Sequence, residues 1–279
     1  MVGWLVDPFG DALMRQALIE VLVLSLACGP LGVWIVLHRQ SYAAESMAHA
    51  MLPGLVVAAL VGAPLLLGAA GGVLAGAVAI ALAGRDERLG GDVGVAVAVS
   101  TLFGAGAMLA LSPSVPPRLG ELLFGDLLGV SGTDLAEAAG LVAVTAVALA
   151  LGQRRFALAT FDPATAPSLG ARPGPWELVL LALLALATVA TVRGLGNLLA
   201  VALVLAPGAA ALNVTHRLGA ALAAAAGLAA ASGVAGLLVS YHWQLAAGAS
   251  VALCAVALFL VSLVAGAWIE ALSPRAAGA

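Results

Sequence analysis

The chain has 279 residues, of which 63% are hydrophobic and 9% are charged, and its formal net charge is −3. Soluble domains carry about 25% charged residues, so this composition excludes a soluble globular protein and predicts one embedded in lipid. The small net charge gives no sign of a nucleic-acid partner. All 11 basic residues are arginine, so the chain lacks the lysine of an ATP-binding P-loop, and any ATP hydrolysis must come from another chain.

Nine apolar stretches are candidates for helices that cross the hydrocarbon core, which takes about 20 residues. In chain order they cover residues 17–37, 47–61, 65–83, 92–111, 134–152, 175–192, 196–214, 219–239 and 245–268. The chain starts without a basic segment and cleavage site, so the first span is expected to act as its own targeting signal. Because no separate soluble segment interrupts the series, residues 1–279 are expected to form one all-α transmembrane domain, a polytopic helix bundle.

Two loops have a predicted structure of their own. Residues 112–133 carry Pro113, Pro116 and Pro117 and then the apolar stretch ELLFGDLLGV, which is too short to span. A re-entrant or interfacial helix is the natural interpretation of that stretch. The other loop, residues 153–174, is the longest hydrophilic segment of the chain.

Arginine placement predicts the orientation. If the N-terminus lies outside, eight of the 11 arginines fall on the inner side and three on the outer side, which is the bias that cytoplasmic loops show. The C-terminus is then cytoplasmic, and so is the loop 153–174.

Glu45 and His49 are the most informative ionisable residues. They are four apart at the start of the second span, so on a helix they share one face about one turn apart. A carboxylate and an imidazole there could hold one divalent cation together, and such incomplete coordination suits a transit site from which the ion must leave again. The alternative is a plain Glu–His hydrogen bond.

The other ionisable and helix-breaking residues favour structural interpretations. Asp126 either caps a helix or faces the ion path, with capping favoured. Glu20 is a lone acid early in the first span, expected near the outer interface, and His242 lies among aromatic residues that fit a membrane-interface belt. His38 is expected to be interfacial. Pro207 within the seventh span predicts a kink, and broken helices often line substrate pathways.

Small residues recur at helical spacing in the third span. Gly68, Gly72 and Gly76 are four residues apart, which predicts close helix–helix packing.

Five segments resemble, in order, the permease family of bacterial zinc, manganese and iron ABC importers. They are LHRQSYAAESMAHAMLPGLVVAAL, GDVGVAVAVSTLFGAGAML, LLFGDLLGVSGTDL, FDPATAPSLGA and LGNLLAVALVLAPGAAAL. In the first, the matching residues are Arg39, Glu45, His49, Ala50, Leu52, Pro53 and Gly54. The family more often has Asp at the position of Glu45 and Ser at that of Ala48, which leaves the metal preference open.

The resemblance implies a permease that transports a zinc, manganese or iron ion, without enzymatic activity or a bound cofactor of its own, in the bacterial cytoplasmic membrane. It implies two permease copies, two ATPase subunits and an extracytoplasmic metal-binding protein. It makes Glu45 and His49 the favoured metal-contacting pair and Asp126 a secondary candidate, and it places pathway residues at Pro53, Gly54 and Pro207. It also implies a cytoplasmic coupling helix that docks on the ATPase, with Phe161, Asp162, Pro163, Ala166, Leu169 and Gly170.

Three alternatives remain on sequence grounds. A permease of the same architecture for metal chelates or siderophores would favour an aromatic-lined cavity, but only 5% of residues are aromatic. An ion-coupled secondary transporter would need several acids near the membrane midplane, and few are present. An intramembrane metalloprotease would need a motif such as His-Glu-x-x-His, which the sequence lacks.

Overall fold

A computed structural model describes residues 2–83, 91–111, 126–162, 164–169, 173–191 and 194–272. Across these residues all regular structure is helical. The α-helices are α1 (Val2–Val6), α2 (Ala12–Leu37), α3 (Ser41–Val61), α4 (Leu65–Ala83), α5 (Gly91–Ala110), α7 (Gly132–Phe161), α8 (Pro173–Thr191), α9 (Asn197–Val214), α10 (Leu218–Trp243) and α11 (Ala247–Leu272). Two short 3-10 helices, η1 (Asp7–Gly10) and η2 (Ala166–Leu169), join them.

Each of the nine predicted spans coincides with one helix from α2 to α11, which confirms the all-α membrane bundle. Within the described residues, five helices are both long and apolar enough to cross a membrane, namely α2, α3, α7, α10 and α11. Helices α4, α5, α8 and α9 contain shorter apolar segments. Half of the predicted re-entrant stretch, residues 121–125, lies outside the described residues, and its other half, residues 126–130, forms a turn and not the predicted helix.

Two helices are longer than their apolar runs. Helix α7 continues to Phe161, although its apolar run ends before Gln153. A polar segment can remain helical once it leaves the hydrocarbon, and here Phe156, which is fully buried, holds the extension against its neighbours. Helix α3 begins at Ser41, six residues before the predicted span, so Glu45 lies within the helix together with His49.

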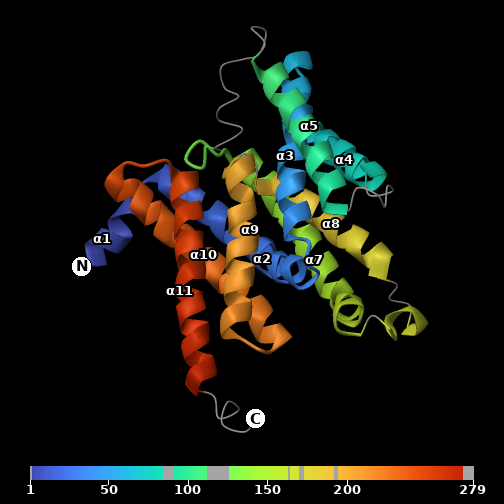
Figure 1. Ribbon diagram of the computed structural model, residues 1–279. Coiled ribbons are helices and arrows are strands. Elements are labelled where there is room, and N and C mark those ends of the chain that lie inside the picture. Colours follow the sequence, from blue (N-terminus) through green and yellow to red (C-terminus); the bar gives the residue numbers. More distant parts are fainter. Residues whose placement is uncertain are drawn as a thin grey trace.

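The long helices form two groups (Figure 1). Helices α3, α4 and α5 pack mainly on one another, and we call them the glycine group. Helices α2, α9, α10 and α11 pack mainly on one another, and we call them the central group. Helices α7 and α8 pair with each other and lean on α2. Consecutive helices α2 and α3 therefore belong to different groups and have little direct contact.

Glycines bring the backbones of the glycine group together. A Cβ atom on Gly72 would lie 2.6 Å from the carbonyl oxygen of Met51, and one on Gly106 would lie 2.8 Å from the backbone nitrogen of Pro53. Gly54 meets Gly68 in the same way. The packing role predicted for the glycine series of α4 is thus confirmed, because no larger residue fits at these contacts.

Large side chains fill the core beside α2. Leu24, Leu31, Trp34 and Ile35 of α2 are fully buried and belong to the main hydrophobic cluster. Glycines assist here as well, since a Cβ atom on Gly29 would lie 2.5 Å from the backbone of Ala225 on α10.

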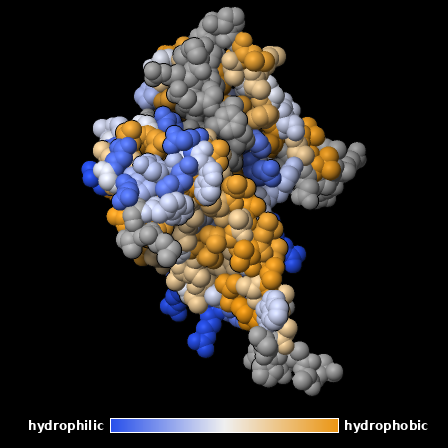
Figure 2. All heavy atoms as spheres, turned by 90° about the vertical axis from the view of Figure 1, so that its left-hand side faces the viewer, coloured by the Kyte–Doolittle hydropathy of each residue, from blue (hydrophilic) through white to orange (hydrophobic). Residues whose placement is uncertain are grey.

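The outer surface carries apolar side chains where a bilayer would contact it. Figure 2 shows an apolar band with hydrophilic residues above it and along its lower rim. Exposed large hydrophobic residues on α11 are Leu253, Val256, Leu260, Val261, Leu263, Val264, Trp268 and Ile269. Contact with lipid or with another membrane chain keeps such a surface out of water.

Helices α3 and α9 continue through their prolines. Pro53 lies inside Ser41–Val61 and Pro207 inside Asn197–Val214, so neither residue is a helix break. Proline has no N–H, so each helix still loses one internal hydrogen bond there, to the carbonyl oxygen four residues earlier. A Pro–Gly pair, Pro53–Gly54 or Pro207–Gly208, therefore marks the point at which each helix bends most easily.

Candidate functional site

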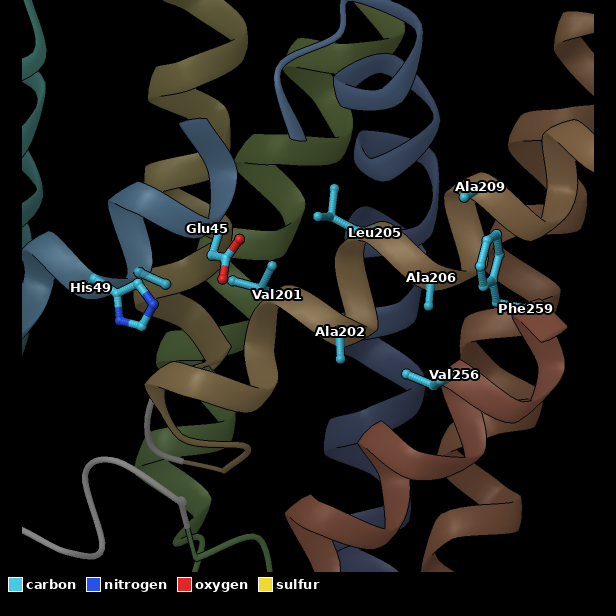
Figure 3. A pocket seen from close by; sticks show the side chains of 10 residues that line it. Glu45, His49, Val201, Ala202, Leu205, Ala206, Ala209, Val256 and Phe259 are labelled. Atoms are coloured by element: carbon cyan, nitrogen blue, oxygen red, sulfur yellow. The ribbon is translucent and has the colours of Figure 1, made fainter. Parts of the chain in front are cut away.

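A pocket of about 450 Å³ lies between the two helix groups. One wall is α3, with Glu45, Ala48 and His49. The other walls are α9 and α11, with Val201, Ala202, Leu205, Ala206, Ala209, Val256 and Phe259. Figure 3 shows Glu45 and His49 side by side at one end, with the labelled α9 side chains next to them and the α11 side chains beyond.

Glu45 and His49 are the ionisable residues among those that line this pocket. Glu45 is exposed to the pocket and His49 is half-buried. The His49 ring packs edge-on against Phe103 of α5, with 5.0 Å between ring centroids, and this contact fixes the ring from behind. The buried Nδ1 atom of His49 has no hydrogen-bond partner in the described part of the chain. A buried polar atom without a partner is costly, so a ligand or water is expected there.

The pair alone is an incomplete set of metal ligands. In the described segments, no group of three or more His, Cys, Asp and Glu residues could hold a metal ion. A bound cation at Glu45 and His49 would keep much of its shell as water, or would take ligands from another chain. Either arrangement gives weak, reversible binding.

Asp126 does not line the pocket. Its side chain is exposed, and its Oδ1 atom accepts a hydrogen bond of 3.0 Å from the backbone N–H of Gly129. The carboxylate thus stabilises the turn before α7, where Ser131 and Asp134 form a capping box. Local turn formation accounts for Asp126 as it stands.

The segment after α7 is a short helical turn. Asp162 accepts a hydrogen bond from the Thr165 backbone N–H at 3.1 Å, and Ala166, at the start of η2, is buried. Phe161 and Leu169 flank this turn and are 63% and 60% exposed. Pro163 and Gly170, also predicted to take part in coupling, lie outside the described residues. The turn therefore presents two large apolar side chains on a compact base.

Glu20 is placed differently from its expected interfacial position. It is 1% exposed, and one of its carboxylate oxygens would lie 2.5 Å from a Cβ atom on Gly194. Oε2 has no hydrogen-bond partner among the described residues. No sequence signal indicated this burial, because the contact joins α2 to the distant turn before α9.

Two histidines have more contacts than the sequence suggested. The His242 ring stacks on Trp4 with 4.2 Å between centroids, and its Nε2 atom lies 3.0 Å from the Trp4 carbonyl oxygen. The aromatic cluster predicted around His242 thus includes α1. His38 lies among aromatic rings of α2 and α7 and pairs with Thr160, a contact that the sequence gave no reason to expect.

Comparison with known proteins relates this geometry to one family. A model of the ABC 3 transport family matches residues 10–266. The chain is 32% identical over 263 residues to a probable iron transport system membrane protein of Haemophilus influenzae, covering 94% of this chain and 97% of the relative. It is 32% identical over 250 residues to the manganese transport system membrane protein MntC of Halalkalibacterium halodurans, covering 89% and 86%. It is 30% identical over 258 residues to the chelated iron transport system membrane protein YfeD of Yersinia pestis, covering 92% and 87%.

Solved structures have the same fold. PsaBC from Streptococcus pneumoniae, in complex with Fab, matches with a TM-score of 0.85 and 25% identity over 94% of this chain and 95% of that one. An inward-facing metal-chelate type ABC transporter matches with a TM-score of 0.70 and 14% identity over 90% and 85%. Because its sequence identity is low, the second match supports only the similarity of the fold.

Proposed function

The chain belongs to the ABC 3 transport family, and we propose that it is the membrane-spanning permease subunit of an ATP-binding-cassette importer for divalent transition-metal ions. The observation that carries this proposal is the Glu45–His49 pair, set in an otherwise apolar pocket between two helix groups. Ionisable side chains at membrane depth are costly and usually serve transport or catalysis.

Manganese and iron are the ions we propose first. The relatives at 30% identity and above carry names for iron, manganese and chelated iron transport. One carboxylate and one imidazole suit Mn²⁺ and Fe²⁺, because carboxylate oxygens favour manganese and imidazole suits iron. Zinc, which imidazole also suits, is the third candidate.

The pocket volume fits an ion that keeps part of its water shell. Six water molecules at about 30 Å³ each occupy about 180 Å³, well within a pocket of about 450 Å³. The pair would replace two of these waters and hold the ion loosely. Asp126 stays a secondary candidate, because its carboxylate is engaged by the Gly129 backbone.

We further propose that energy comes from a separate ATPase that docks on the turn between α7 and α8. The exposed side chains of Phe161 and Leu169 support this, since two large apolar groups on a compact turn suit insertion into a groove of a partner. Arginine placement supports a cytoplasmic position for this turn, with the N-terminus outside in the bacterial inner membrane.

Two other partners complete the proposed assembly. An extracytoplasmic binding protein would deliver the ion. A second copy of the chain would cover the pocket from the side of α11, where the apolar residues Val256 and Phe259 line it. Residues 1–279 would act as one permease domain within the pair.

The function is tested by metal content in cells that lack this chain and are complemented with variants. We expect the deletion to lower cellular manganese or iron, and the native chain to restore it. Glu45→Ala and His49→Ala should each lower the rate of restoration at least about tenfold, because loss of a ligand or its support costs about 10- to 100-fold in metal affinity.

Matched controls are available outside the pocket. Glu137→Ala on α7 and His216→Ala before α10 remove exposed residues of the same types, and both should behave like the native chain. All variants should reach the membrane in equal amounts. Normal metal uptake by both pocket variants would remove the pair from the mechanism, and a change in zinc alone would contradict the choice of manganese or iron.

A metal-chelate permease is the alternative that a specific observation favours. One relative is named for chelated iron, and the pocket exceeds what a hydrated ion needs. Competition separates the two: excess free Mn²⁺ should suppress uptake of a labelled metal ion here, whereas a chelate permease would respond to the chelate and not to the free ion.

A further inference from the structure

A cluster of aromatic rings joins α2, α7 and α8 at the end of the bundle next to η2. Phe156 of α7 is fully buried at its centre. Its ring centroid lies 5.5 Å from that of Trp34 on α2 and 5.4 Å from that of Trp176 on α8. The Arg155 guanidinium lies 5.0 Å above the Trp176 ring, a cation–π contact that ties α7 to α8 a second time.

One turn further along, α7 and α2 also meet through a polar contact. His38 Nδ1 lies 3.0 Å from the Trp34 carbonyl oxygen, and because a carbonyl only accepts, Nδ1 carries the proton of that bond. The Thr160 hydroxyl oxygen lies 3.1 Å from the other nitrogen, Nε2, and 3.3 Å from Nδ1. The same hydroxyl lies 2.8 Å from the Phe156 carbonyl oxygen in its own helix. Residues 34 and 38 thus face residues 156 and 160, one turn apart on each helix.

From Thr160 the chain leads directly to the turn proposed to dock on the ATPase. Asp162 follows Phe161, its backbone N–H donates to the Leu158 carbonyl, and its own carbonyl accepts from Ala166 at 2.9 Å. The turn is therefore hydrogen-bonded to the end of α7, and displacement of η2 displaces Thr160.

From His38 the chain leads directly to the metal pair. Helix α2 ends with the Arg39 N–H on the Val36 carbonyl and the Gln40 N–H on the Ile35 carbonyl, which is the Schellman arrangement. Arg39 occupies the left-handed region at φ 56°, where a residue other than glycine is uncommon. Helix α3 begins at Ser41, one turn before Glu45. The joint is short, and its Arg39 and Gln40 N–H groups are hydrogen-bonded to α2, so it passes on a shift of α2.

We propose that the His38–Thr160 contact is the coupling link that carries movement of the ATPase-docking turn to Glu45 and His49. Phe156 and Trp34 hold the two helices at the right separation, and His38 and Thr160 fix their register. These are positioning residues: they touch neither the ion nor ATP. The inference rests on the proposed function and adds the path by which ATP hydrolysis opens the pocket.

The test compares three variants in the complete complex, reconstituted in liposomes with its ATPase and binding protein. Thr160→Val removes the hydroxyl and keeps the shape of the side chain. Thr160→Ser keeps the hydroxyl. Thr101→Val is the matched control, because the Thr101 hydroxyl on α5 also bonds the carbonyl four residues earlier, at 2.8 Å, but is exposed. The quantity measured is metal ions taken up per ATP hydrolysed.

We expect Thr160→Val to lower uptake per ATP at least about threefold while ATP hydrolysis stays within about twofold of the native rate, a size typical of coupling variants. Thr160→Ser should restore the native ratio, and Thr101→Val should not change it. A native ratio in Thr160→Val would overturn the proposal. So would a proportional fall of uptake and hydrolysis, which indicates a structural role. If the native complex takes up no metal at all, the proposed function fails before the link is tested.

Discussion

The glycine group and the central group are both apolar helix bundles with close glycine contacts, yet they differ in how many large side chains fill the space between their helices. Helix α2 alone contributes Leu24, Leu31, Trp34 and Ile35 to the fully buried core. Among the described residues of α4 and α5, the buried hydrophobic side chains are Ala69, Val73 and Val99. Interlocked large side chains resist relative movement, because any shift opens cavities. Where backbones touch through glycine, fewer large side chains have to repack when one helix moves along another.

The difference matters because the metal pair belongs to one group and faces the other. Glu45 and His49 lie on α3, which is joined to α4 and α5 through glycine contacts, and they look towards α9 and α11. The central group is firmly packed and moves as one body, and a small movement of that body relative to α3 and its partners would open or close the pocket. The boundary between the groups is where we expect substitutions to have the largest effect on transport.

Filling the pocket should have the largest effect. Ala202 lines the pocket from α9, so Ala202→Trp would place an indole ring between the two groups. We expect metal uptake to fall by at least about tenfold, because the ion can no longer reach the pair. Ala223→Trp, at an exposed position of α10, adds the same ring outside the pocket and should transport normally.

Both proteins should be present in the membrane in equal amounts, as measured by immunoblotting of membrane fractions. Full activity of Ala202→Trp would show that the ion does not pass between the two groups. The boundary between the groups would then have no special role in transport.

Most of the helices and one wall of the site could be predicted from the sequence. Apolar runs and turn residues located the long helices of the described residues, and the spacing of Glu45 and His49 placed both on one helix face, because helical periodicity is a local property. The glycine spacing of α4 predicted a close contact for the same reason. The extension of α7 to Phe161 was missed, since a polar Gln-Arg-Arg run reads as a loop unless the burial of Phe156 is known.

The far walls of the site could not be predicted. Val201 and Val256 are small apolar residues like many others in the chain, and only the fold brings them opposite Glu45. Burial of Glu20 was missed because Gly194, which leaves room for its carboxylate, belongs to a distant segment. In each case the deciding contact is long-range, and residue type alone does not encode it.

A methyl group in the glycine contact should have an intermediate effect. A Cβ atom on Gly72 would lie 2.6 Å from the Met51 carbonyl oxygen, whereas one on neighbouring Gly71 meets nothing within 4 Å. We expect Gly72→Ala to destabilise the protein by about 1–3 kcal/mol, the usual cost of overpacking. Gly71→Ala should be neutral or slightly stabilising, because alanine favours the helix by about 1 kcal/mol.

The measurement is the thermal unfolding midpoint of the two purified variants in the same detergent. Equal midpoints would mean that α3 and α4 are not held by this contact. The distinction between the two groups would then have no basis in packing.

The smallest effect is expected at the two residues other than glycine that adopt a left-handed backbone conformation in the described part of the chain. Gln244 joins α10 to α11 within the central group at φ 52°, and Arg39 joins α2 to α3 across the two groups at φ 56°. An L-residue in this region costs about 1–2 kcal/mol and glycine avoids that cost, so Gln244→Gly and Arg39→Gly should each raise stability by up to about 1 kcal/mol.

Only Arg39→Gly also makes the joint between the two groups more flexible, because glycine adopts other backbone conformations readily. Uptake per ATP should therefore fall about twofold in Arg39→Gly and stay native in Gln244→Gly. Arg39→Ala separates the arginine charge from the backbone: it removes the charge, keeps the Cβ atom, and should leave the ratio unchanged. A fall of the same size in Arg39→Ala would assign the effect to the lost charge and would argue against a stiff joint between the two groups.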